Sequence, residues 1–156
     1  MLYNIFMNIL ISPQSFKGSI SALNTAKAIS IGVKKVLPDA NTIILPVADG
    51  GDGTLETLVD FSKGKIISCK VLDPLGLLIN SNWGGMGDGN TAVIEMAKMS
   101  GLALVQPSKR NPMYTTTYGL GQTIKDGLDK GYRNFIIGIG GSATNDGGVG
   151  MAQTLG

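Results

Sequence analysis

The apolar positions of the chain alternate between short continuous runs and stretches with helical spacing. Residues 9–11 form an apolar run ended by a Ser-Pro pair, which is typical of a buried parallel strand. Residues 22–36 then carry small or apolar side chains every three or four positions, and Pro38 follows, so this spacing predicts a helix. Residues 42–45 predict a second strand. The chain therefore opens with a strand, a helix and a strand.

The rest of the chain continues this alternation with a different middle part. A helix is predicted after Thr54, which we expect to cap it, and Gly64 ends it. A further helix is predicted over residues 116–130, and a last one begins near residue 147. The other apolar runs predict strands at residues 66–72, 77–83, 91–96 and 135–139. A tight-turn signal before residue 91 favours partly antiparallel pairing there.

Strands that alternate with helices predict the α/β class. The pattern changes near residues 73–76, and we place the boundary between two α/β parts there. The sequence stops about nine residues into its last predicted helix, where a βαβ unit would next supply a strand. We therefore interpret the sequence as the front part of a larger protein, with exposed sheet edges through which we expect self-association.

Composition excludes several classes of function. With 43% apolar and 15% charged residues the chain can bury a core, and its net charge of +2 does not favour binding to nucleic acid or to an anionic membrane. Histidine is absent and Cys69 is the single cysteine, which excludes His-ligated zinc and internal disulfides and fits the cytosol. No apolar stretch approaches the roughly 20 residues of a membrane helix, and a signal peptide is not indicated.

The strongest local signal is a glycine-rich segment, residues 138–148, that follows an apolar strand and enters a helix. Backbone N–H groups at such a turn converge on an anion, and Asp146 adds a carboxylate that can hold a metal ion or accept a proton. The candidate phosphate- or substrate-binding residues are Gly140, Gly141, Ser142, Ala143, Thr144 and Asn145. The alternative is an ordinary strand-to-helix turn, although we expect that one turn does not need five glycines.

A second candidate is the loop of residues 49–54, which also joins a strand to a helix. Asp49 and Asp52 lie three residues apart on it, which suits Mg²⁺ that retains waters or a general base for a hydroxyl. The same residues also fit an ordinary role, in which Asp52 or Thr54 caps the helix and Asp49 starts a turn. Both loops follow presumed parallel strands, and open α/β sheets bind ligands at that end.

Three more charged residues are candidates. Lys17, in the loop after the first strand, suits a phosphate as a point charge, and Arg110 suits a substrate carboxylate; for each, a solvated surface position is the alternative. Glu95 ends an apolar run, where a carboxylate requires a partner or a role.

Six segments of the chain, in order, resemble motifs of the bacterial two-domain glycerate kinases. They are ILISPQSFKGS, PVADGGDGT, TAVIEMAKMSGLALV, KRNP, TTTYG and GIGGSATNDGGVGMAQ. The resemblance covers nearly all of the chain from Met7 onward. It implies an enzyme that transfers the γ-phosphoryl group of ATP to a hydroxyl of D-glycerate with Mg²⁺. It also implies two α/β domains, one inserted into the other, with the active site between them.

The resemblance assigns expected roles to the candidates. Residues 1–75 would be the N-terminal part of a Rossmann-like parallel-sheet domain, and residues 76–156 the first part of the inserted, mixed-sheet domain. Lys17, Asp49 and Asp146 would be catalytic, with Asp49 and Asp52 at the metal.

Two positions depart from the family pattern. Gln14 stands where the family has Asp, and Asp52 stands where it has Glu; an amide cannot serve as a charged ligand or a base. Two alternatives therefore stay open, an inactive fragment that only binds a ligand or partner chain, and an NAD(P)-dependent oxidoreductase suggested by the glycine spacing over residues 138–143.

Overall fold

The computed structural model describes residues 7–16 and 19–156, and its chain divides into two units, Met1–Ala48 and Asp49–Gly156. Lys17, the proposed phosphate ligand, lies outside the described residues.

The first unit is a βαβ motif. Strands β1 (Asn8–Ile11) and β2 (Asn41–Ile44) pair in parallel, and α1 (Ala22–Val36) connects them. The side chain of Ser21 caps α1 by accepting a hydrogen bond from the Asn24 N–H at 3.3 Å. This agrees with the strand, helix and strand predicted from the apolar pattern.

The second unit contains a mixed sheet. Its strands, in spatial order, are β3 (Lys65–Leu72), β4 (Leu78–Gly85), β5 (Thr91–Glu95) and β6 (Asn134–Gly138). β4 pairs antiparallel with β3 and with β5, whereas β5 and β6 are parallel. The antiparallel pairs follow from the short turns that join consecutive strands, and the parallel pair follows from the long helical crossover before β6.

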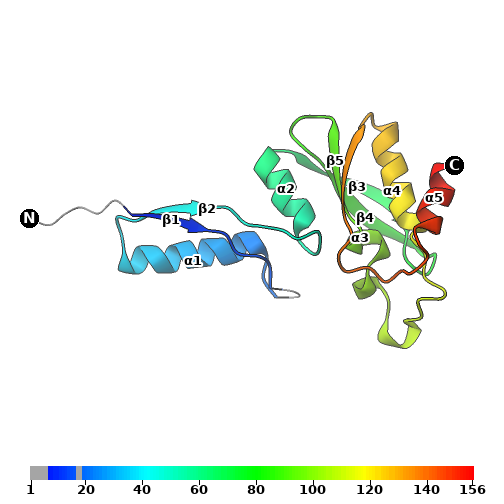
Figure 1. Ribbon diagram of the computed structural model, residues 1–156, viewed down its shortest axis with the longest axis horizontal. Helices are drawn as coiled ribbons and strands as arrows, with labels where there is room; N and C mark the ends of the chain where they lie inside the picture. Colours follow the sequence, from blue (N-terminus) through cyan, green and yellow to red (C-terminus); the bar gives the residue numbers. More distant parts are fainter. Residues whose placement is uncertain (1–6, 17–18) are drawn as a thin grey trace, which may run out of the picture. The chain divides into compact units, whose positions relative to one another are not determined.

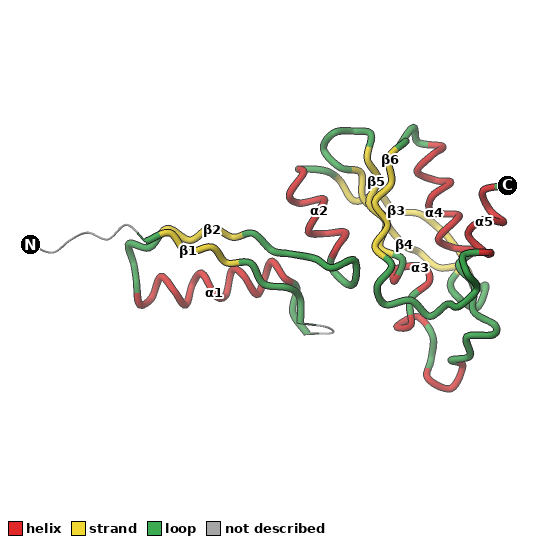
Figure 2. The backbone as a smooth tube through the Cα atoms, in the orientation of Figure 1, coloured by secondary structure: helices red, strands yellow, loops and turns green. Residues whose placement is uncertain are grey.

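Helices cover both faces of this sheet (Figures 1 and 2). On one face α2 (Thr54–Ser62) packs with Leu55 and Val59 against Val93 of β5. On the other face lie α4 (Tyr118–Asp129) and, packed on it, α5 (Val149–Leu155). The core under α4 contains the fully buried Trp83, with Val71, Ala92, Ile94, Met99, Leu120 and Ile124.

The segment between β5 and α4 is irregular. It contains the short helix α3 (Ala97–Ser100) and two 3₁₀ turns, Leu102–Leu104 and Pro107–Lys109. The apolar pattern does not predict these short turns, because each is too brief to establish a helical period.

The predicted α/β class, with one parallel sheet and one mixed sheet, is confirmed. The predicted domain boundary near residue 75 stays a prediction; β3 and β4, on either side of it, pair along their whole length. Over residues 7–16 and 19–156, no helix combines the length and the apolar character needed to cross a membrane.

Candidate functional site

Two glycine-rich loops meet at one edge of the mixed sheet. We call residues 49–54 the Asp49 loop and residues 139–148 the Ser142 loop. The Gly140 N–H donates a hydrogen bond to the Gly50 carbonyl oxygen at 2.8 Å. Glu95 and Gly138, the last residues of the parallel strands β5 and β6, are register partners at this edge. The loops thus lie where open α/β sheets bind ligands.

The glycines at this junction are required by backbone packing. A Cβ atom on Gly138 would lie 2.6 Å from the Gly50 carbonyl oxygen, and one on Gly140 would lie 2.6 Å from the Gly51 Cα. Side chains at either position would therefore force the loops apart. From the sequence, we interpreted the glycines of residues 138–148 as ligand-binding. The structure shows that two of them, Gly138 and Gly140, are needed for the contact between the two loops.

The same packing uses several N–H groups of the predicted anion cradle. Besides Gly140, the Ala143 N–H donates to the Ser100 carbonyl at 2.9 Å, and the Thr144 N–H to the Ser142 hydroxyl at 3.0 Å. Within the described part of the chain, no partner is recorded for the N–H groups of Gly141, Ser142 and Asn145. An anion bound at this loop would therefore meet three of the six predicted N–H donors.

Asp146 is held by hydrogen bonds from two segments. Its carboxylate accepts from the Thr117 N–H at 2.8 Å and from the Thr117 hydroxyl at 2.9 Å. It also accepts from the N–H groups of Gly148 and Gly150, each at 3.1 Å. Partial burial alone would raise the pKa of Asp146, but these hydrogen bonds together lower it. Asp146 therefore joins the start of α4 to the start of α5, a structural role that the sequence did not indicate.

The two carboxylates of the Asp49 loop are exposed. The Asp49 carboxylate accepts a hydrogen bond from the Gly51 N–H at 3.0 Å, as in an Asx turn. A Cβ atom on Gly141 would lie 3.6 Å from Oδ1 of Asp52, so Asp52 faces the Ser142 loop. Both acidic residues thus stay near the junction and open to solvent.

The predicted cap at Thr54 is wrong. The N-cap of α2 is Gly53, in the left-handed region at φ 92°, and Thr54 is the first helical residue. The Thr54 hydroxyl instead accepts a hydrogen bond from the Gly50 N–H at 3.1 Å and donates to the Gly51 carbonyl at 2.7 Å. It therefore shapes the Asp49 loop rather than the helix end.

Glu95 supplies the missing cap from a distant strand. It is 3% exposed, and its carboxylate accepts from the N–H groups of Gly53 at 3.1 Å and Leu55 at 3.2 Å. Burial raises the pKa of Glu95, against the lowering effect of these N–H groups and of Lys98. The sequence showed that this buried carboxylate needed a partner, but the partner lies 40 residues earlier.

Arg110 lines a pocket beside the Ser142 loop. The pocket has a volume of about 300 Å³ and is lined by Leu102, Val105, Arg110, Asn111, Pro112, Thr115, Ser142, Ala143 and Thr144. The Arg110 Nε–H donates to the Val105 carbonyl at 3.2 Å, which anchors the side chain. For its terminal N–H groups, no hydrogen bond to a described residue is recorded. The Thr115 hydroxyl donates to the Ala143 carbonyl at 2.8 Å, which joins two further lining residues. The structure therefore brings Arg110 together with Ser142 and Thr144.

The described residues contain no cluster of three or more Asp, Glu, Cys or His side chains that could hold a metal ion. A metal at this edge would therefore rely on Asp49 and Asp52 together with oxygens from a ligand or water. Mg²⁺ accepts such a site, since it keeps several waters and takes one or two carboxylates plus phosphate oxygens.

Comparison with known proteins identifies related sequences over almost the whole chain. A sequence model of the glycerate kinase family matches residues 9–156. The chain is 58% identical over 150 residues to a glycerate kinase of Haemophilus influenzae, covering 96% of this chain and 40% of that protein. It is 51% identical over 150 residues to the glycerate 2-kinase of Escherichia coli, covering 96% of this chain and 39% of that protein.

A solved structure shows the same similarity. The crystal structure of a putative glycerate kinase 2 from Salmonella typhimurium LT2 matches with a TM-score of 0.84 and 50% sequence identity, over 97% of this chain and 40% of that one. The chain thus spans about two fifths of the length of the relatives it matches.

Proposed function

Because the chain belongs to the glycerate kinase family, we propose that it forms part of an enzyme that transfers the γ-phosphoryl group of ATP to a hydroxyl of D-glycerate. The observation that carries this proposal is the junction of the Asp49 and Ser142 loops, joined by the hydrogen bond from Gly140 to Gly50. It gathers N–H donors, hydroxyls and carboxylates at one strand end. Phosphoryl transfer depends mainly on such positioning and on charge neutralisation.

In this proposal the N–H groups of Gly141, Ser142 and Asn145, for which no partner is recorded in the described part of the chain, bind phosphate oxygens. Their neighbours in the loop are held, since the N–H groups of Gly140, Ala143 and Thr144 donate to Gly50, Ser100 and Ser142, so the donors are positioned before a ligand binds. Preorganised donors of this kind stabilise developing negative charge without a cost of reorganisation. Lys17, outside the described residues, stays the proposed phosphate ligand of the first unit.

Asp49 is the proposed base for the glycerate hydroxyl. The hydroxyl oxygen bonds to the γ-phosphorus, the bond from that phosphorus to the bridging oxygen breaks, and ADP leaves. The hydroxyl proton passes to the Asp49 carboxylate, which is exposed and hence accessible to a substrate. The Asp146 carboxylate is occupied by N–H and hydroxyl donors, so we propose that it positions the loop rather than reacts.

We propose that the Arg110 pocket binds the carboxylate of glycerate. Its volume of about 300 Å³ suits a small organic acid. A planar guanidinium recognises a carboxylate through two parallel hydrogen bonds, and the hydroxyls of Ser142 and Thr144 lie on the wall shared with the loop. The substrate would thus lie between Arg110 and the phosphate-binding N–H groups.

Mg²⁺ is the metal that this proposal includes, with Asp49 and Asp52 as its protein ligands. The metal would supply charge neutralisation of the phosphate groups. The two carboxylates contribute orientation, since Asp49 is tied to its own loop through the Gly51 N–H and Asp52 faces Gly141.

The test is a coupled assay of ADP formation with ATP and D-glycerate, on two proteins. One is the 156-residue chain; the other is a chimera in which this chain replaces the matching 150 residues of the Haemophilus influenzae relative. We expect the chimera to be active and Asp49→Asn to reduce kcat at least 100-fold without lowering the melting temperature. The matched control, Asp129→Asn on the exposed end of α4, should keep activity within twofold.

Three results would decide against parts of this proposal. A folded but inactive chimera would favour the alternative of an inactive fragment that only binds ligand or partner. Activity of Asp49→Asn near that of the parent would remove Asp49 as base and metal ligand. Turnover by the 156-residue chain alone would show that the remaining part of the relatives is not required.

We also propose self-association of the chain and a cytosolic location. Leu10 and Ile43, paired across the two-stranded sheet, are 60% and 47% exposed, and apolar sheet surface of this kind favours association with a second copy. A free Cys69 and the use of ATP suit a reducing cytosol. Light scattering should detect dimers or larger species that Leu10→Lys reduces; a monomer at 100 μM (about 1.6 g/L) would contradict the proposal.

A further inference from the structure

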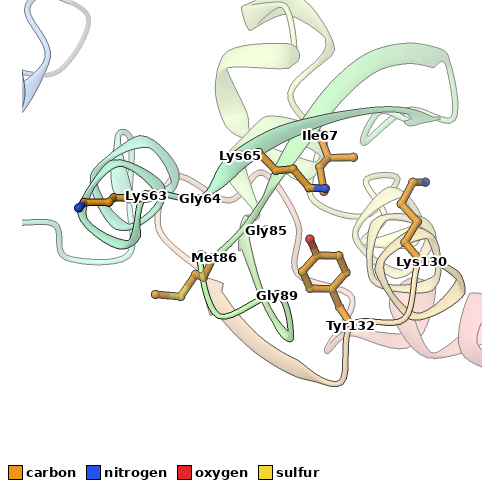
Figure 3. Close-up of a pocket in the computed structure, with 10 residues that line it drawn as sticks. Lys63, Gly64, Lys65, Ile67, Gly85, Met86, Gly89, Lys130 and Tyr132 are labelled. Carbon is orange, nitrogen blue, oxygen red and sulfur yellow. The ribbon is translucent and has the colours of Figure 1, made fainter.

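A second pocket, about 580 Å³ in volume, lies away from the loop junction (Figure 3). It is lined by Lys63, Gly64, Lys65, Ile67, Gly85, Met86, Gly87, Gly89, Lys130 and Tyr132. These residues come from the start of β3, the end of β4 and the segments that precede β5 and β6. The Asp49 and Ser142 loops adjoin the other ends of β5 and β6. Because β5 and β6 are parallel, the two sites occupy opposite edges of the sheet.

The lining of this pocket is basic. Three of its ten residues are lysines, and none is acidic. Lys130 forms an ion pair with Asp126 one turn earlier on α4, which reduces its effective charge. For Lys63 and Lys65, no ion pair with another described residue is recorded. Figure 3 shows the Lys65 and Lys130 side chains on the side of the Tyr132 ring and the Lys63 ammonium directed away from them. Lys65 therefore supplies the main uncompensated charge.

Tyr132 adds an oriented polar group. The residue is 6% exposed, and its ring packs edge-on against Trp83 with ring centres 5.0 Å apart and an interplanar angle of 89°. Its hydroxyl lines the pocket without a recorded hydrogen bond to any described residue. Figure 3 shows this hydroxyl pointing toward the side on which the Lys65 ammonium lies. The Tyr132 ring is buried, and its hydroxyl at the pocket wall is left to form hydrogen bonds with solvent or with a ligand.

The position of the Tyr132 hydroxyl is fixed by its surroundings. A Cβ atom on Gly85 would lie 2.1 Å from it, so only glycine at this β4 position lets the ring reach the pocket. The Tyr132 N–H donates to the Gly127 carbonyl at 3.0 Å and anchors the residue to α4. The hydroxyl is thus held at one place, as expected of a donor in a preformed site.

We propose that this pocket binds a small phosphate-bearing anion, with Lys65 and Tyr132 as its main donors and Lys130 as a third. A lysine ammonium group acts as a point charge and suits the three terminal oxygens of a phosphate group, whereas a planar carboxylate favours arginine. No arginine lines the pocket. The apolar side chains of Ile67 and Met86 also line it, so a phosphorylated organic molecule fits better than inorganic phosphate alone. The site is separate from the proposed kinase site and does not depend on that proposal.

The test is a titration of the 156-residue, 16.2 kDa chain with inorganic pyrophosphate, followed residue by residue in ¹H–¹⁵N NMR spectra. We expect saturable shifts of the amide signals of Lys65, Met86 and Gly87 with one common dissociation constant. Lys65→Gln should weaken binding about tenfold, and Tyr132→Phe, which keeps the ring contact with Trp83, should weaken it about threefold. Malonate, a dicarboxylate, should bind at least tenfold more weakly than pyrophosphate.

The matched control is Lys70→Gln. Lys70 is exposed on the same strand, five residues from Lys65 and hence on the opposite face of the sheet. Its substitution should change the dissociation constant less than twofold. The proposal is overturned if shifts are confined to the Ser142 loop or absent, if Lys70→Gln weakens binding as much as Lys65→Gln, or if malonate equals pyrophosphate. Because the signals are resolved by residue, these outcomes do not depend on whether the kinase proposal holds.

Discussion

Asp146→Asn is the substitution that separates a structural from a catalytic role at the Ser142 loop. In the parent, one carboxylate oxygen accepts from the Thr117 N–H and hydroxyl and from the Gly150 N–H, and the other accepts from the Gly148 N–H. An asparagine has one acceptor oxygen and one NH₂ group. Whichever way the amide turns, its NH₂ group faces an N–H donor, so at least one bond is lost and the others lose the charge of their acceptor.

The expected loss of stability follows from these bonds. A hydrogen bond to a charged group contributes about 1.5–3 kcal/mol and a neutral one about 1 kcal/mol. Asp146 is only partly buried, so water replaces part of what is lost. We expect the free energy of unfolding to fall by about 2 kcal/mol, which lowers the melting temperature by about 4–8 °C for a chain of this length. The control Asp129→Asn should change it by less than about 0.5 kcal/mol.

The pH dependence gives the sharper result. The pKa of Asp146 is lowered in the folded chain, so its stabilising effect is complete above the ordinary aspartate pKa of about 3.9. It is lost as pH falls through the lowered pKa. The gap between parent and Asp146→Asn, measured by urea unfolding at pH 3 to 7, should therefore be constant above pH 5 and shrink below pH 4. A gap that stays the same down to pH 3, or one under about 0.5 kcal/mol at pH 7, would refute the reasoning.

Three further substitutions test the site. Gly140→Ala places a Cβ atom 2.6 Å from the Gly51 Cα and should lower the free energy of unfolding by about 1–3 kcal/mol. The control Gly32→Ala, with open space around it, should not lower it. Equal effects of the two substitutions would contradict the packing argument. Glu95→Ala should lower the free energy of unfolding by about 1–2 kcal/mol, because the helix cap is lost. Glu95→Gln keeps an acceptor. Because the folded pKa of Glu95 is raised, the parent loses stability as pH rises from 4 to 7, so Glu95→Gln should become more stable relative to the parent over that range in urea unfolding. In the chimera, Arg110→Lys should raise KM for glycerate about tenfold with kcat within threefold; an unchanged KM would exclude the carboxylate contact.

The elements with a clear apolar period were predictable from the sequence. The apolar run at residues 135–139 predicted a strand, and β6 spans Asn134–Gly138; α4 places Leu120 and Ile124 on one face. Burial requires these patterns wherever the element packs, so they appear without knowledge of the partner. The closeness of the two glycine loops was predicted, but the expected reason was wrong: the strand before the Asp49 loop, β2, belongs to the two-stranded sheet, whereas β6 belongs to the four-stranded one. The loops meet through the hydrogen bond from the Gly140 N–H to the Gly50 carbonyl oxygen, which local sequence rules do not show.

The roles of individual polar residues at the site were not predictable, since each depends on a partner distant in sequence. Glu95 caps a helix that begins about 40 residues earlier, and Asp146 receives its hydrogen bonds from Thr117, 29 residues away. Sequence spacing identifies only capping residues that lie next to their own helix, as we expected of Thr54. Here the α2 cap comes from a neighbouring strand, so local rules named the wrong residue.

The carboxylates at the loop junction differ in how firmly the fold holds them, and this decides which of them we propose as a proton acceptor. A carboxylate that accepts several buried or half-buried N–H bonds, as Asp146 and Glu95 do, cannot release them to take a proton without destabilising the fold. Asp49 is exposed, and its carboxylate accepts the Gly51 N–H of its own loop. The N–H groups divide in a similar way: those of Gly140, Ala143 and Thr144 donate within the fold, whereas those of Gly141, Ser142 and Asn145 have no recorded partner among the described residues. Within the Ser142 loop, the N–H groups that hold the fold and those proposed to bind a ligand therefore belong to different residues.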